Sequence, residues 1–78
     1  MITDVRVLVV DDEANQREAL GGFLLKRGYD TVLAADGDTA LRIVHDSVVD
    51  VMLTDVRMPG MDGAELLAKA KAAAEGLF

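Results

Sequence analysis

Val5-Arg6-Val7-Leu8-Val9-Val10-Asp11-Asp12 is the stretch of sequence that decides the fold. Residues 5–10 are apolar and mostly β-branched, apart from Arg6. This composition is typical of a strand in a parallel sheet that is covered on both faces. Asp11 and Asp12 then end the apolar run. The stretch therefore predicts a buried strand with two carboxylates just beyond its carboxyl end.

An amphipathic helix is expected over residues 14–27. Gly21 and Gly22 lie inside it, and each should weaken it by roughly 1 kcal/mol relative to alanine. Gly28 is expected to end the helix, because glycine is common just after the last helical turn. The apolar stripe expected to face the sheet consists of Ala19, Leu20, Phe23 and Leu24.

The rest of the chain repeats this alternation of strand and helix. Residues 31–34 predict a second strand, and residues 36–38 contain a capping aspartate that predicts the start of a second helix. Residues 51–54 predict a third strand, with Asp55 at its carboxyl end. Asp62 is expected to cap a third helix that runs to about residue 75.

Strand and helix alternating three times predict right-handed crossovers and a parallel sheet. We expect one α/β domain over residues 1–78, built from strand–helix units at residues 1–28, 29–47 and 48–78. With the first strand in the centre, the three-stranded sheet has the order 2-1-3. This order brings the carboxyl ends of the first and third strands to one crevice.

Composition narrows the classes of function. The chain has 78 residues, with 8 Lys and Arg against 14 Asp and Glu and a formal net charge of −6. This balance argues against direct binding of nucleic acid and suits a divalent cation or a basic protein. The absence of cysteine excludes disulfides, zinc–thiolate sites and thiol nucleophiles. No stretch approaches the length of a membrane span, so a cytoplasmic location is expected.

Three carboxylates are expected to meet at this crevice, from Asp11, Asp12 and Asp55. Two carboxylates 4 Å apart repel by roughly 4 kcal/mol at an effective dielectric constant near 20. The site therefore needs a proton, a basic partner or a cation. Ligands that are all oxygen select a hard ion, and Mg²⁺ with several retained waters, or Mn²⁺ in its place, is the natural choice. A carboxylate beside Mg²⁺ can attack phosphorus and form an aspartyl phosphate.

Several motifs resemble bacterial response-regulator receiver domains. Residues 7–13 are similar to the acidic signature that opens these domains, and residues 55–63 resemble their phosphoacceptor and the loop after it. Gly28-Tyr29 and residues 35–41 also resemble segments of these domains. These motifs are most similar to those of receivers that precede enhancer-binding transcriptional activators. The resemblance implies a flavodoxin-like fold, of which this chain is the N-terminal (βα)3 part.

Roles for individual residues come from this resemblance. It implies that a histidine kinase or phosphotransfer protein phosphorylates Asp55. It also implies that Asp12 and Asp55 bind Mg²⁺ through carboxylates, Arg57 through its backbone carbonyl and Asp11 through water. The residues expected to shape the loop are Met58, Pro59 and Gly63.

The chain departs from the family in one respect. A complete receiver has five strands and five helices, so the chain is expected to be truncated. The family's hydroxyl residue after the fourth strand and its lysine after the fifth have no counterpart here. Lys69 and Lys71 cannot replace that lysine, because they lie on a predicted helix. We therefore expect a phosphoacceptor with impaired function and no turnover of an external substrate.

Two other functions remain open. The first is an aspartate-nucleophile phosphatase of the haloacid dehalogenase type. Asp11 and Glu13 are a poor match to the spaced pair of aspartates in that class of enzyme. The second is a receiver fragment that no longer signals and acts as a scaffold or oligomerisation module. A homo-oligomer is expected through the open edge of the third strand, whose apolar residues are Val51, Met52 and Leu53, with help from Leu77 and Phe78. His45 is interpreted as a solvated residue at a helix end rather than a phosphotransfer histidine.

Overall fold

Three strands alternate with three helices in the computed structural model, which describes residues 5–55 and 63–73. The elements are β1 (Arg6–Val10), α1 (Ala14–Lys26), β2 (Asp30–Ala34), α2 (Gly37–Asp46), β3 (Val51–Thr54) and α3 (Gly63–Ala73). The predicted α/β alternation is confirmed, and the third strand has the predicted bounds. Within the described ranges, none of the helices has the length and apolar character of a membrane span.

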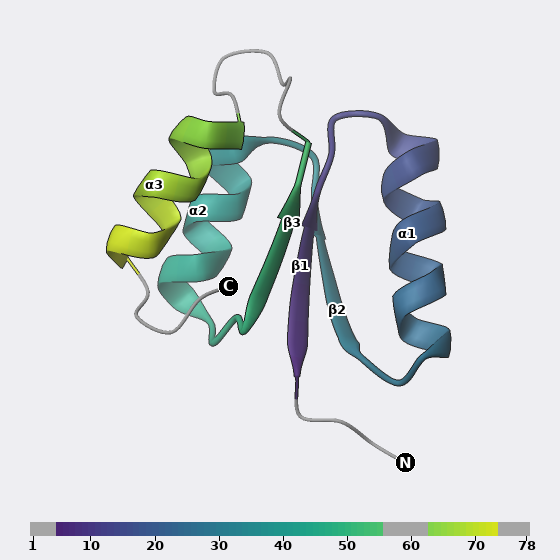
Figure 1. Ribbon diagram of the computed structural model, residues 1–78. Coiled ribbons are helices and arrows are strands. Elements are labelled where there is room, and N and C mark those ends of the chain that lie inside the picture. The colour runs from purple at the N-terminus through teal and green to yellow at the C-terminus, as the bar shows by residue number, and fades with distance from the viewer. Residues whose placement is uncertain (1–4, 56–62, 74–78) are drawn as a thin grey trace.

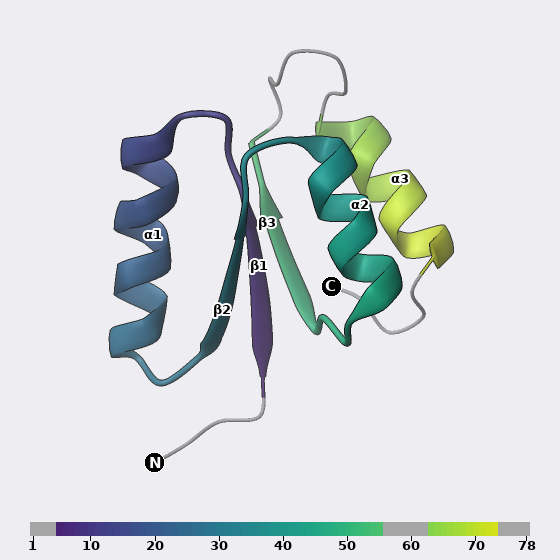
Figure 2. The same cartoon turned by 180° about the vertical axis from the view of Figure 1, so that it is seen from behind.

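β1 is the central strand of the sheet. It pairs in parallel with β2 on one edge and with β3 on the other, so the order β2-β1-β3 confirms the prediction. In this register Leu8 lies opposite Val32 of β2 and Met52 of β3. α1 lies against one face of the sheet, whereas α2 and α3 lie side by side on the other, as the front and rear views show (Figures 1 and 2).

The core is centred on β1, in agreement with a strand that is covered on both faces. Residues Val7–Val10 expose between 0% and 4% of their surface. On the face covered by α2 and α3, Leu8 and Val10 belong to one cluster with buried residues of both helices, among them Ala40, Val44, Leu66 and Ala70. Burying one leucine or valine side chain of this cluster stabilises the fold by roughly 1.5–3 kcal/mol.

Arg6 explains why a charged residue interrupts the apolar run of β1. Its side-chain Nε lies 2.8 Å from Asp30 Oδ2, at the start of β2. Its backbone N–H donates to Asp50 Oδ2 at 2.8 Å, just before β3. One residue therefore joins the amino ends of the three strands, at the edge opposite to the carboxylates.

The apolar stripe predicted for α1 is wrong. Gly21 is the one buried residue of this helix, whereas Leu20 and Phe23 expose 37% and 53% of their surface. A Cβ atom on Gly21 would lie 2.7 Å from Leu33 Cδ2 of β2. The helix therefore approaches the sheet through the position that has no side chain. The amphipathic pattern could not show this, because it depends on Leu33 in another element.

Polar residues define the ends of the helices. The Glu13 carboxylate caps α1 by accepting hydrogen bonds from the backbone N–H groups of residues 15 and 16. Gly28 follows α1 with a φ of 91°, as predicted for a glycine that ends a helix. Asp36 caps α2 by accepting from the Thr39 backbone N–H at 2.7 Å, and this hydrogen bond lowers the pKa of Asp36. The predicted cap Asp62 lies outside the described residues.

The two glycines of α1 allow a test of this packing. Gly22→Ala should stabilise the fold by roughly 1 kcal/mol, because alanine favours the helix and nothing lies within 4 Å of the new Cβ. Gly21→Ala should gain less or destabilise, because Leu33 must move. Urea denaturation of both variants measures the difference. Equal gains would show that α1 does not approach β2 through Gly21.

Candidate functional site

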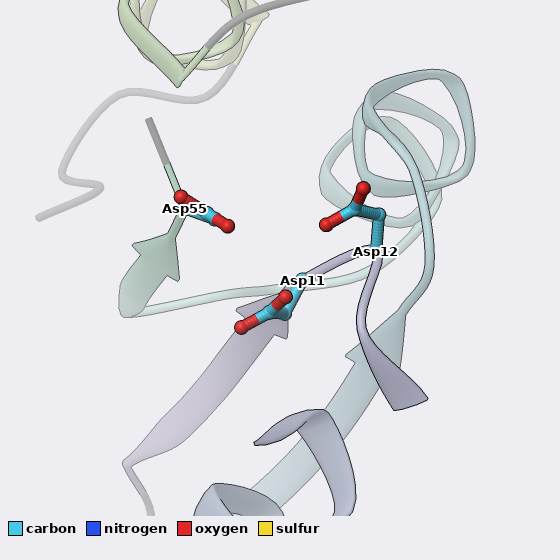
Figure 3. A group of neighbouring side chains, drawn as sticks. All are labelled: Asp11, Asp12 and Asp55. Carbon is cyan, nitrogen blue, oxygen red and sulfur yellow. The ribbon is translucent and has the colours of Figure 1, made fainter. Parts of the chain in front are cut away.

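Asp11, Asp12 and Asp55 meet at the carboxyl edge of the sheet. Asp11 and Asp12 follow β1, and Asp55 follows β3. One carboxylate oxygen from each lies within 4.8 Å of the others. Figure 3 shows the Asp12 and Asp55 side chains pointing toward one another across the gap between the two strand ends. The structure thus brings together the three acids that the sequence singled out.

The connections of the two strands create this gap. β1 continues into α1 on one face of the sheet, whereas α3, the helix that comes after β3, lies on the opposite face (Figure 1). Neighbouring parallel strands whose connections diverge in this way form the crevice in which α/β proteins bind ligands. The Asp55 backbone N–H donates to Val10 O at 3.0 Å, which extends the β1–β3 pairing up to the acid.

Asp11 is held at three points. Its backbone N–H donates to Ala34 O of β2 at 3.1 Å. Its carboxylate Oδ1 accepts from the Glu13 backbone N–H at 2.9 Å. Its backbone carbonyl accepts from Arg17 Nη1 at 2.8 Å. Sequence reasoning missed Arg17, because a bond between a side chain and a carbonyl six residues earlier has no periodic signature.

The crevice is open to solvent. Asp12 is exposed, whereas Asp11 and Asp55 are half-buried. Beside them, on the α1 side of β3, lies a shallow depression of about 280 Å³. Its lining residues are Asp11, Gln16, Leu20, Leu53, Thr54 and Asp55. A small charged group can therefore reach the half-buried carboxylates from solvent.

The donor set fits a hard divalent cation. The three carboxylates supply only oxygen ligands, which Mg²⁺ and Ca²⁺ prefer. Two ligands on opposite sides of Mg²⁺ lie about 4.2 Å apart, because each bond is about 2.1 Å long. The observed spread of up to 4.8 Å needs a small adjustment, or a water in place of one direct bond.

Other predicted residues lie elsewhere or are not described. Arg57, Met58 and Pro59 fall outside the described residues. Gly63 is the buried first residue of α3. His45 stands in the last turn of α2 with 79% of its side chain exposed and its Nδ1 3.1 Å from Asp46 Oδ1. This agrees with the interpretation of His45 as a solvated residue at a helix end.

Fold and site together define a doubly wound α/β domain with an acidic crevice between β1 and β3. The sequence matches the response regulator receiver domain family over residues 7–77. The chain therefore belongs to this family, and the resemblance seen in the sequence is confirmed.

Two relatives illustrate the match. The chain is 40% identical over 72 residues to the sporulation initiation phosphotransferase F of Bacillus subtilis, covering 92% of this chain and 58% of the relative. It is 42% identical over 66 residues to the regulatory protein AtoC of Escherichia coli, covering 85% of this chain and 14% of that protein. The chain thus spans only part of the length of either relative.

Solved structures of a response regulator superpose on this chain. The response regulator protein TrrA of Thermotoga maritima, in complex with Mg²⁺ and BeF, superposes with a TM-score of 0.87 at 34% identity. The match covers 94% of this chain and 64% of that one. TrrA in complex with the histidine kinase ThkA gives a TM-score of 0.86, also at 34% identity, and covers 94% of this chain and 63% of that one.

The closeness of the three acids predicts that Mg²⁺ stabilises the fold. Added MgCl₂ should raise the melting temperature, because a bound cation relieves carboxylate repulsion. At 100 times the dissociation constant the gain is about 2.7 kcal/mol. Asp12→Asn should melt higher than the wild type without metal and lose most of the response to Mg²⁺. Scanning calorimetry with and without MgCl₂ measures both effects.

Asp46→Asn is the matched control, because it removes the same charge from an exposed residue at the end of α2. It should respond to Mg²⁺ like the wild type. A wild-type response in Asp12→Asn would remove Asp12 from the cation site.

Proposed function

We propose that the chain is a phosphoacceptor module of two-component signalling, with residues 1–78 acting as one receiver domain. Asp55 accepts the phosphoryl group, and Asp11, Asp12 and Asp55 hold Mg²⁺. The observation that carries this proposal is the approach of the three carboxylate oxygens to within 4.8 Å at the ends of β1 and β3. Membership of the receiver family supports it and favours it over an aspartate-nucleophile phosphatase.

Asp55 is the best candidate for the nucleophile. It is half-buried, and its backbone is fixed by the hydrogen bond to Val10. In the proposed reaction an Asp55 carboxylate oxygen attacks the phosphorus of a phosphohistidine. The new oxygen–phosphorus bond forms as the nitrogen–phosphorus bond breaks, and the histidine nitrogen recovers its lone pair. Asp11 and Asp12 remain unmodified in this step.

Mg²⁺ would be held by the carboxylates of Asp12 and Asp55, with Asp11 acting through water. When bound, it neutralises negative charge on the transferring phosphoryl oxygens. The proposal also includes the Arg57 backbone carbonyl as a ligand, and Met58, Pro59 and Gly63 as residues that shape the loop. Mn²⁺ has the same preference for oxygen ligands and is expected to substitute.

A histidine kinase or a phosphotransfer protein is the proposed phosphoryl donor. The complex of ThkA with TrrA supports a kinase partner for a related receiver. We propose no turnover of an external substrate, no direct contact with nucleic acid and a cytoplasmic location. For the 78-residue polypeptide we propose reduced efficiency, because the family's phosphate-contacting hydroxyl and lysine have no counterpart in its sequence.

Phosphorylation is the direct test. With acetyl phosphate and MgCl₂, the polypeptide should gain the mass of one phosphoryl group, more slowly than TrrA assayed alongside it. Asp55→Asn should gain nothing, because the amide cannot act as the nucleophile. Intact-mass spectrometry over time measures the uptake.

Asp46→Asn serves again as the control and should be modified at the wild-type rate. Uptake that persists in Asp55→Asn would mean that another residue is the acceptor. Absence of uptake by the wild type, with bound Mg²⁺ demonstrated, would contradict the phosphoacceptor function itself.

A second candidate function is self-association through β3. Among the described strands, β3 pairs only with β1, so its other edge has no strand partner there. A groove of about 430 Å³ runs beside this edge, and its lining includes no charged residue. The lining residues are Met52, Leu53, Thr54, Gly63, Ala64 and Leu67. Leu53 and Leu67 expose 39% and 38% of their surface.

The proposed occupant of this groove is a second copy of the chain. A two-fold axis at the edge would set β3 against β3, so that each copy supplies the strand that the other needs. The same apolar side chains would then meet from both sides. No charged lining residue would have to be buried without a partner.

A pair of exposed leucines tests this candidate. Leu53→Lys on β3 should shift the polypeptide from dimer to monomer, because it buries a charge in the proposed interface. Leu25→Lys on α1 should leave the dimer intact, since Leu25 is 60% exposed and lies on a helix away from β3. Light scattering after size exclusion at micromolar concentration measures the mass. A monomeric wild type would exclude self-association under these conditions.

A further inference from the structure

Arg17 occupies an unexpected position in this acidic crevice. It lies in the first turns of α1 and is half-buried. Its Nη1 donates to the backbone carbonyl of Asp11 at 2.8 Å. Although Arg17 lies beside an acidic cluster, it forms no ion pair with any residue in the described ranges. The contact that the structure gives its guanidinium is therefore with a neutral group.

The carbonyl that Arg17 holds belongs to the peptide unit between Asp11 and Asp12. A peptide unit is planar, so fixing its carbonyl also fixes the direction in which the chain enters Asp12. The two neighbouring peptide units are restrained too. The Asp11 backbone N–H, in the preceding unit, donates to Ala34 O, and the Glu13 N–H, in the following unit, donates to Asp11 Oδ1. The Asp12 side chain, which is exposed, depends on this backbone for its direction toward Asp55 (Figure 3).

α1 provides a rigid base for this contact. The Glu13 carboxylate caps the helix through the N–H groups of Asn15 and Gln16, at 3.2 and 2.8 Å. The Arg17 backbone N–H donates to Glu13 O at 3.0 Å, which closes the first turn. Arg17 therefore connects an ordered helix start to the turn that carries two of the three acids.

We infer that Arg17 is a positioning residue, which orients the Asp11–Asp12 peptide so that the Asp12 carboxylate faces Asp55 and binds a divalent cation. This inference rests on the proposed function, because it presupposes a cation at the three acids. It assigns Arg17 no contact with the cation or with the phosphoryl group. Mutating a residue that orients a metal ligand without touching the metal typically lowers metal affinity by 10- to 100-fold.

The sign of the change in Mg²⁺ affinity separates positioning from simple electrostatics. If Arg17 acted only through its charge, removing it would tighten Mg²⁺ binding, because one like charge near the cation would be lost. If Arg17 positions Asp12, removing it weakens binding. Calorimetric titration of Arg17→Ala with MgCl₂ should give a dissociation constant raised by about 10-fold or more. The titration is done well below the melting temperature, after circular dichroism has shown that the variant is folded.

Two further variants complete the experiment. Arg17→Lys keeps a charged donor and should recover much of the affinity. Arg42→Ala removes the same charge from an exposed residue of α2 and should leave the affinity unchanged or slightly tighter.

The outcomes are distinguishable. Affinity that is unchanged or tighter in Arg17→Ala overturns the positioning role, and so does a loss in Arg17→Lys equal to that in Arg17→Ala. A wild-type chain that does not bind Mg²⁺ contradicts the cation site of the proposed function instead. If Arg17→Ala is unfolded, the Mg²⁺ dissociation constants of Arg17→Lys and Arg17→Gln are compared with that of the wild type instead. In that case, a dissociation constant that is lowest for arginine and highest for glutamine supports positioning, and equal constants overturn it.

Discussion

The structure depends on one constraint, which is that β1 must be paired on both edges and covered on both faces. Its residues Val7–Val10 are almost fully buried, and each contributes roughly 1.5–3 kcal/mol when covered. Covering both faces requires α1 on one side and α2 with α3 on the other. Pairing both edges requires β2 and β3. Once β1 is central and the strands are parallel, the carboxyl ends of β1 and β3 must lie side by side.

This constraint brings together side chains that repel one another. Asp11 and Asp12 form no ion pair with a described residue. At the opposite edge of the sheet, by contrast, Arg6 pairs with Asp30 and also binds Asp50 through its backbone. Arg6 thus holds Asp30 and Asp50 where they join strands, whereas three acids come together where the crevice opens. Such a local conflict with stability is characteristic of a functional site.

The fold and the placement of the acids could be predicted from the sequence because both depend on local patterns. An apolar run followed by two aspartates indicates a buried strand with acids at its end, and strand–helix alternation determines the parallel order. The packing of α1 could not be predicted, because it depends on the contact between Gly21 and Leu33 in another element. The bond between Arg17 and the Asp11 carbonyl was missed for a similar reason, since it follows from the three-dimensional turn and not from periodicity.

The β1–β3 register is the most sensitive part of the site. All three acids directly follow these two strands, and the bond from the Asp55 N–H to Val10 O ties the strands in register. A shift by one residue would turn Asp55 toward the other face of the sheet. The crevice also adjoins the start of α1, where the Glu13 carboxylate accepts hydrogen bonds from two backbone N–H groups of the first turn. Negative charge at Asp11 and Asp12 therefore lies close to the amino end of α1, where the helix dipole favours it.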